Sequence, residues 1–122
     1  MARLLVIDDD LDLAKLTAIR LTKAGHNVTS AHDGETGLAA IRDQHPELVV
    51  LDWMMPGMDG IEVCTAVRAD TEIAATPMIM LTAKSAPADI DRAFEAGVNA
   101  VMTKPYTSAD LAARISTILE AA

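Results

Sequence analysis

Four apolar segments of the sequence are each followed by side chains suited to acid, metal or phosphate chemistry. The pairs of segment and polar residue are Leu4–Ile7 before Asp8, Asp9 and Asp10, Leu48–Leu51 before Asp52, Met78–Leu81 before Thr82, and Ala100–Met102 before Lys104. In open α/β sheets, ligands bind beyond the carboxyl ends of the strands. If the four segments are parallel strands of one sheet, the carboxylates, the hydroxyl and the amine meet at one edge.

Carboxylates gathered at one edge would repel each other. Two unit charges about 4 Å apart, at an effective dielectric constant of about 20, repel by about 4 kcal/mol. Either one carboxyl is protonated or a cation lies between them. Mg²⁺ is the natural cation, because it prefers oxygen ligands and is usually held by one or two carboxylates with water and phosphate. The three histidines (His26, His32 and His45) are scattered and we expect them at the surface rather than around a softer metal.

The same residues form a complete set for moving a phosphoryl group onto a carboxylate. An aspartate can attack phosphorus and form an aspartyl phosphate. A bound metal and the Lys104 amine would offset the charge on the phosphoryl oxygens, and the Thr82 hydroxyl would hydrogen-bond another. The sequence therefore predicts a phosphoacceptor among these carboxylates.

The segments between the apolar runs have the spacing of amphipathic helices. A fifth, weaker strand is expected at 27–31, so the order is strand then helix, five times. The helical stripes are Leu13/Thr17/Leu21/Ala24, Leu38/Ile41, Ile61/Cys64/Val67, Ile90/Phe94/Gly97 and Leu111/Ile115/Ile118. This alternation predicts a doubly wound parallel sheet covered on both faces. The length of 122 residues predicts one domain, residues 1–122.

Composition narrows the function classes. Apolar residues make up 51% of the chain and aromatic residues only 2%, so we expect an aliphatic core. The net charge of −8 argues against direct nucleic-acid binding, which depends on Lys and Arg. The lone Cys64 cannot form an intrachain disulfide and is expected in the core. No apolar run approaches a membrane span and no signal peptide is evident, so we expect a cytoplasmic protein.

Several motifs, in order and at their spacings, resemble the receiver domains of bacterial two-component response regulators. They are Val6-Ile7-Asp8-Asp9, Leu51-Asp52-Trp53-Met54-Met55-Pro56-Gly57-Met58-Asp59-Gly60, Leu81-Thr82-Ala83 and Thr103-Lys104-Pro105-Tyr106. The resemblance covers the whole chain. It implies a flavodoxin-like fold with strand order 2-1-3-4-5. It also implies a signalling module rather than an enzyme.

The resemblance assigns roles to individual residues. Asp52 would be phosphorylated, and Thr82 and Lys104 would contact the phosphoryl oxygens. Mg²⁺ would be bound by Asp52, by Asp9, by the backbone carbonyl of Met54 and, through water, by Asp8. The bond between Lys104 and Pro105 would be cis. The phosphoryl donor would be a phosphohistidine of a sensor histidine kinase or a histidine phosphotransfer protein. The response would alter the surface of the fourth helix, fifth strand and fifth helix, read by an effector or output domain.

Two further positions are expected to set how long the phosphoryl group persists. Met54 lies two residues after Asp52, and Lys84 lies two residues after Thr82. By resemblance both flank the path of the attacking water. Met54 is apolar and cannot orient that water, so we expect slow hydrolysis.

The sequence departs from many receivers at the expected switch position. Val101 stands where they carry Tyr or Phe, and Asn99-Ala100 replaces an acidic pair found in many DNA-binding regulators. We therefore expect a smaller response, centred on residues 83–87 and the start of the fourth helix.

Three alternatives compete with this hypothesis. A flavin-binding protein of the same fold needs a phosphate-binding loop after the first strand, and Asp8-Asp9-Asp10-Leu11-Asp12 would repel phosphate. A haloacid-dehalogenase-like phosphatase needs a second Asp at the position of Met54. A phosphate sink or shuttle has the same chemistry and stays open.

Capping and reporter positions complete the expectations. Asp33 and Asp59-Gly60 are expected at helix starts, and Gly25 at a helix end. Asp10 begins the first helix or faces solvent. Trp53 lies on the opposite side of its strand from Asp52, packing in the core or reporting on the site by fluorescence.

Overall fold

Five apolar segments form one parallel sheet in the computed structural model, which describes residues 1–121. The strands are β1 (Arg3–Ile7), β2 (Asn27–Ala31), β3 (Leu48–Asp52), β4 (Met78–Thr82) and β5 (Ala100–Thr103). Their order across the sheet is β2-β1-β3-β4-β5, and every neighbouring pair is parallel. The expected fold and strand order are therefore confirmed. Asp52 and Thr82 are themselves the last residues of their strands.

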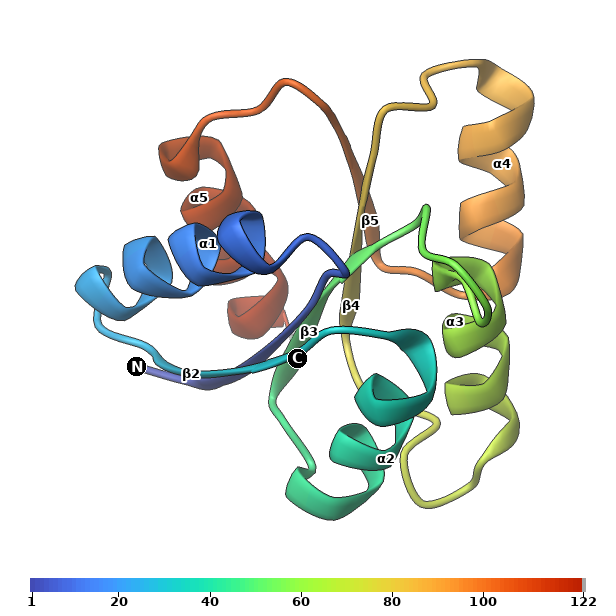
Figure 1. Cartoon of the computed structure of the whole chain (residues 1–122), viewed down its shortest axis with the longest axis horizontal. Coiled ribbons are helices and arrows are strands. Elements are labelled where there is room, and N and C mark those ends of the chain that lie inside the picture. The colour runs from blue at the N-terminus through green and yellow to red at the C-terminus, as the bar shows by residue number, and fades with distance from the viewer. Residues whose placement is uncertain (122) are drawn as a thin grey trace.

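Five helices alternate with the strands and cover both faces of the sheet. They are α1 (Leu11–Lys23), α2 (Gly34–Gln44), α3 (Gly60–Ala69), α4 (Pro87–Ala96) and α5 (Ser108–Ala121). Helices α1 and α5 lie on one face, and α2, α3 and α4 lie on the other (Figure 1). The loops after β1, β3, β4 and β5 gather along one edge of the sheet, where parallel strands end.

Alternate side chains of the strands supply two cores. The first core lies between the sheet and helices α2, α3 and α4, and it includes Leu5, Ile7 and Leu51. The second core lies between the sheet and helices α1 and α5, and it includes Leu4 and Val50. The central strands β3 and β4 are buried along their whole length. Burial on both faces explains why these strands read as continuous apolar runs rather than as alternating patterns.

The expected helix ends are confirmed. Asp10, Asp33 and Asp59 cap α1, α2 and α3 by accepting hydrogen bonds from backbone N–H groups of the first turn. Gly25 follows α1 with a φ of +102°, a conformation that glycine adopts without strain. Cys64 is buried, as expected, and its thiol lies 3.1 Å from the carbonyl oxygen of Ala96.

Three apolar residues expected on buried stripes are instead exposed, namely Leu13, Ala24 and Phe94. Phe94 has 48% of its surface exposed, because the buried side of α4 is formed by Ala93, one residue earlier. Leu13 has 40% of its surface exposed, because α1 buries Ala14 and Leu21. Among residues 1–121, no helix combines the length and hydropathy needed to cross a bilayer.

Candidate functional site

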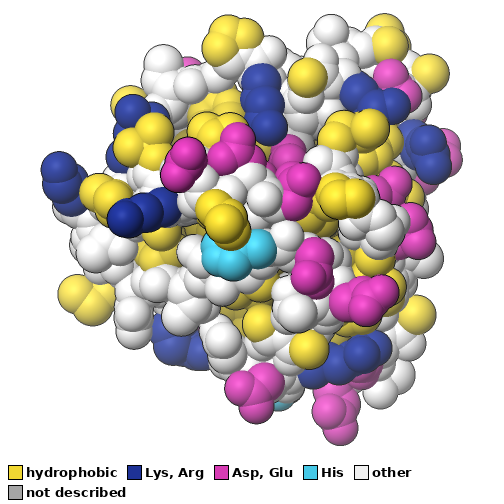
Figure 2. Space-filling view, in the orientation of Figure 1, with side chains coloured by type: hydrophobic (Ala, Val, Ile, Leu, Met, Phe, Trp, Pro, Cys, Tyr) yellow, Lys and Arg dark blue, Asp and Glu magenta, His cyan; other side chains and the backbone are white. Residues whose placement is uncertain are grey.

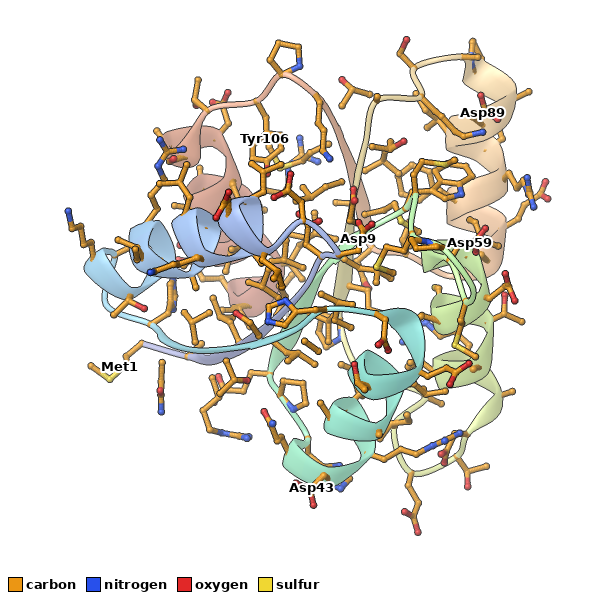
Figure 3. The ribbon with its side chains drawn as sticks, in the orientation of Figure 1. Met1, Asp9, Asp43, Asp59, Asp89 and Tyr106 are labelled. Carbon is orange, nitrogen blue, oxygen red and sulfur yellow. The ribbon has the colours of Figure 1, made fainter. Side chains whose placement is uncertain are left out.

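The ends of two paired strands bring three carboxylates together. Ile7 lies opposite Leu51 in the β1–β3 register, so Asp8 and Asp9 follow β1 beside Asp52 at the end of β3. One carboxylate oxygen from each aspartate lies within 4.8 Å of the others. Asp8 and Asp52 are buried, whereas Asp9 is exposed. Figure 3 shows Asp9 near the middle of the molecule, between the two helical layers.

Burial makes this carboxylate cluster electrostatically unfavourable when it is fully ionised. It raises the pKa of Asp52, against the opposing effect of a hydrogen bond from Lys104. Burial also raises the pKa of Asp8, where the charge of Asp52 adds to the effect and the Asp10 N–H opposes it. A divalent cation would stabilise the ionised carboxylates, and three carboxylates within reach of one another suit a cation that prefers oxygen. Figure 2 shows several acidic side chains near the upper middle of the molecule.

Lys104 pairs directly with the buried aspartate. It follows β5, and its Nζ lies 3.0 Å from Asp52 Oδ1. Burial alone would lower the pKa of Lys104, but the hydrogen bond and charge of Asp52 outweigh it and raise the pKa. The amine therefore stays charged at neutral pH. The Lys104–Pro105 bond is cis, as expected.

Thr82 ends the strand next to β3. Thr82 is only 1% exposed. The preceding residue, Leu81, lies opposite Asp52 in the β3–β4 register. Thr82 Oγ1 accepts a hydrogen bond of 2.9 Å from the backbone N–H of Lys84. A hydroxyl has one proton and two lone pairs, so Thr82 retains a proton to donate.

The remaining expected site residues lie outside this cluster. Met54 is 58% exposed, beyond the end of β3. The Lys84 ammonium lies 5.1 Å from the centroid of the Trp53 ring system. Val101 is half-buried on β5, opposite Met80, and packs against the core. The structure thus brings together Asp8, Asp9, Asp52 and Lys104, with Thr82 on the adjoining strand end.

Two arginines that matter in the structure were missed in the sequence. The Arg92 guanidinium carbon lies 6.0 Å from the Trp53 ring centroid. Arg68 donates hydrogen bonds to backbone carbonyls of two loops. Neither contact could be predicted from the sequence, because each depends on how segments distant in the sequence pack together. Trp53 itself is buried in the core, at 2% exposure.

Comparison with known proteins identifies a single family. The model of the response regulator receiver domain matches residues 4–116. The DNA-binding response regulator MtrA of Mycobacterium tuberculosis is 41% identical over 113 residues, which are 93% of this chain and 48% of MtrA. The transcriptional regulatory protein AfsQ1 of Streptomyces coelicolor is 40% identical over 119 residues, 98% of this chain and 52% of AfsQ1. The chain thus spans about half the length of the curated relatives it matches.

Solved structures agree with the sequence comparison. A response regulator from Chloroflexus aurantiacus superposes with a TM-score of 0.92 at 34% identity, covering 98% of both chains. The chemotaxis protein CheY4 of Vibrio cholerae superposes with a TM-score of 0.91 at 28% identity, covering 97% of this chain and 98% of that one.

Proposed function

The chain belongs to the response regulator receiver domain family, and from this premise we propose that it accepts a phosphoryl group on Asp52. The observation that carries the proposal is the buried Asp52 carboxylate, paired with the Lys104 ammonium at 3.0 Å beside two further aspartates. We propose that residues 1–122 act as one receiver domain. The donor is a phosphohistidine of a sensor histidine kinase or of a histidine phosphotransfer protein.

In the proposed transfer, a carboxylate oxygen of Asp52 attacks phosphorus while the bond from phosphorus to the donor nitrogen breaks. The electron pair of that bond returns to the imidazole. Lys104 contacts Asp52 Oδ1 before the reaction, so its charge is already in place for the negative charge that develops. Thr82 donates its hydroxyl proton to a phosphoryl oxygen. Lys104 is already in contact with Asp52 and needs little reorganisation, which lowers the barrier.

Asp8, Asp9 and Asp52 supply the carboxylates of the proposed Mg²⁺ site, together with the backbone carbonyl of Met54 and with Asp8 acting through water. When bound, Mg²⁺ offsets the negative charge of the carboxylates and of the incoming phosphoryl group. The proposed ligands lie on the two strand ends and the loop after β3, so the metal site forms only in the folded chain.

The proposed output is a change in the surface of α4, β5 and α5. The N-cap of helix α4, Ala86, makes no side-chain hydrogen bond to the helix, and Ala93 is the only fully buried residue of the helix among those described. Val101 on β5 is half-buried, and Phe94 presents an exposed ring on α4. Relatives named as DNA-binding response regulators are about twice as long as this chain, which supports an output domain or a separate effector as the reader of this surface.

Incubation with a small acyl phosphate tests the proposed function. In Mg²⁺, intact-mass spectrometry should show one added phosphoryl group, lost at alkaline pH as expected of an acyl phosphate. A chelator should prevent the addition. No mass gain in Mg²⁺ at any acyl phosphate concentration, under conditions in which a known receiver domain reacts, would contradict the proposal.

Mg²⁺ is expected to stabilise the protein and to change the emission of Trp53. A ligand at ten times its dissociation constant stabilises the native state by about 1.4 kcal/mol if it binds only that state. Protons compete with the metal at Asp8 and Asp52, whose pKa values are raised, so the apparent affinity should fall as the pH is lowered. Thermal melts and fluorescence titrations measure both effects.

Asp9→Asn should abolish both responses to Mg²⁺. Asp43→Asn is the matched control, because Asp43 lies on α2 at the far end of the molecule from Asp9 (Figure 3). An unchanged melting temperature and emission in the intact protein at millimolar Mg²⁺ would disprove the metal site.

Met54→Asn is expected to speed hydrolysis of the aspartyl phosphate. An amide can orient a water molecule with a hydrogen bond, whereas the methionine thioether does so poorly. One hydrogen bond of about 1 kcal/mol gained in the transition state corresponds to about fivefold in rate. Loss of the phosphoryl mass over time measures the rate, and Met54→Leu is the apolar control. Equal rates in all three proteins would refute a role for this position, and Lys84 would then be the remaining candidate.

A further inference from the structure

The indole of Trp53 binds cationic side chains from two separate segments. The Lys84 ammonium lies 5.1 Å from the ring centroid, and the Arg92 guanidinium carbon lies 6.0 Å from it. Cations within about 6 Å of an aromatic centroid are attracted to the negative face of the ring. Lys84 belongs to the connection after β4, and Arg92 to the second turn of α4. Trp53 directly follows Asp52, so one buried ring joins both segments to the end of β3.

Helix α4 has few other anchors. Its N-cap, Ala86, makes no side-chain hydrogen bond, and Ala93 is the only residue of the helix that is fully buried in the described structure. Helix α3, which lies beside α4 in Figure 1, has a reciprocal capping box and four buried residues. The contact of Arg92 with Trp53 is therefore one of few side-chain contacts described for the first half of α4.

Lys84 also connects the indole of Trp53 to the hydroxyl of Thr82. Its backbone N–H donates to Thr82 Oγ1 at 2.9 Å, while its ammonium lies over Trp53. If Thr82 rotates to donate to a phosphoryl group on Asp52, the geometry of this hydrogen bond must change. The backbone of Lys84 then shifts, and its side chain shifts with it.

We propose that Trp53, Lys84 and Arg92 form a cation–π clamp in which Trp53 is the positioning residue for the start of α4. In the unmodified protein the clamp fixes the connection after β4 and the first two turns of α4 against β3. Phosphorylation of Asp52 loosens the clamp through Thr82 and Lys84, and so frees the surface of α4. This second step rests on the proposed function, whereas the clamp itself does not.

Amide hydrogen exchange of the unmodified, full chain tests the clamp. In Lys84→Met and in Arg92→Met, amides of residues 88–96 should exchange about two- to fivefold faster, the range expected from loss of one partly exposed cation–π contact. Lys84→Arg keeps the charge and should exchange like the natural protein. Amides of β1 and β3 serve as internal controls and should not change. If the amides of α4 exchange in both methionine variants at the rate of the natural protein, the proposed clamp is wrong.

The emission of Trp53 gives an independent readout, because it is the only tryptophan in the chain. Lys84→Met should change the emission spectrum and Lys84→Arg should restore it. A purely structural role of Lys84 elsewhere would leave the emission unchanged, and that result would also count against the clamp. Trp53→Phe keeps a buried ring that binds cations more weakly, and should give intermediate exchange in α4.

A beryllofluoride adduct formed in Mg²⁺, used as a phosphoryl mimic, tests the link to phosphorylation. In the natural protein it should speed exchange in α4, and in Lys84→Met it should add little to an already raised rate. An equal further increase in both proteins would overturn the link between phosphorylation and the clamp. If the variants loosen α4 but beryllofluoride does not bind the natural protein, the clamp stands and the proposed phosphorylation of Asp52 is wrong.

Discussion

Lys104→Met is expected to slow phosphoryl uptake from an acyl phosphate by about 100- to 1000-fold, the usual effect of removing one preorganised charge-stabilising group. The Lys104 ammonium lies 3.0 Å from Asp52 Oδ1 before the reaction, and its raised pKa keeps it charged. Methionine has a similar shape and no charge. The developing charge on the phosphoryl oxygens would then lack its cationic partner.

Intact-mass time courses at saturating Mg²⁺ measure this loss, and a thermal melt of the same variant separates it from unfolding. Lys23→Met is the matched control, because Lys23 is exposed at the end of α1 and should react like the natural protein. A folded Lys104→Met protein that is phosphorylated at the natural rate would remove Lys104 from the mechanism.

Arg68→Met is expected to lower the free energy of unfolding by about 3 kcal/mol, since three half-buried carbonyls would lose their partner at about 1 kcal/mol each, the lower end of the range for an unpaired group. The guanidinium donates to the carbonyl oxygens of Gly97, Ala74 and Thr76 at 2.6 to 2.9 Å, and to Asn99 Oδ1 at 3.1 Å. These contacts join α3 to the loop before β4 and to the loop before β5. The φ of Gly97 is +112°, and an added Cβ there would clash with the Arg68 side chain.

Arg42→Met provides the comparison for this prediction. Arg42 makes an exposed ion pair with Asp70 at 3.0 Å, and exposed pairs contribute only about 0–1 kcal/mol. Urea unfolding of the two variants should therefore differ by at least about 2 kcal/mol. Equal destabilisation would show that Arg68 does not join the loops in solution.

The fold was predictable because its central strands, β3 and β4, are buried on both faces. Runs such as Leu48–Leu51 and Met78–Leu81 contain no polar residue, and a sheet covered by helices is the arrangement that buries them completely. The convergence of Asp8, Asp52 and Lys104 then follows from parallel strands ending at one edge. No side-chain detail was needed for that inference.

The positions that were missed depend on packing between elements distant in sequence. Helical spacing marked Phe94 as apolar but did not reveal that Ala93 would face the core instead. The ammonium of Lys84 lies over Trp53 because of the course of the connection after β4, which local sequence does not specify. Arg68 binds backbone carbonyls, which every residue has, so the sequence does not show which residues Arg68 contacts.

Reduction with borohydride, followed by peptide mapping, tests most directly that Asp52 is the phosphoacceptor. Borohydride converts an aspartyl phosphate to homoserine and leaves free aspartates unchanged. After reaction with acyl phosphate and Mg²⁺, homoserine should appear at position 52, and Asp52→Asn should give none while Asp43→Asn reacts normally. Homoserine at Asp8, Asp9 or Asp59 with an unmodified Asp52 would contradict the account.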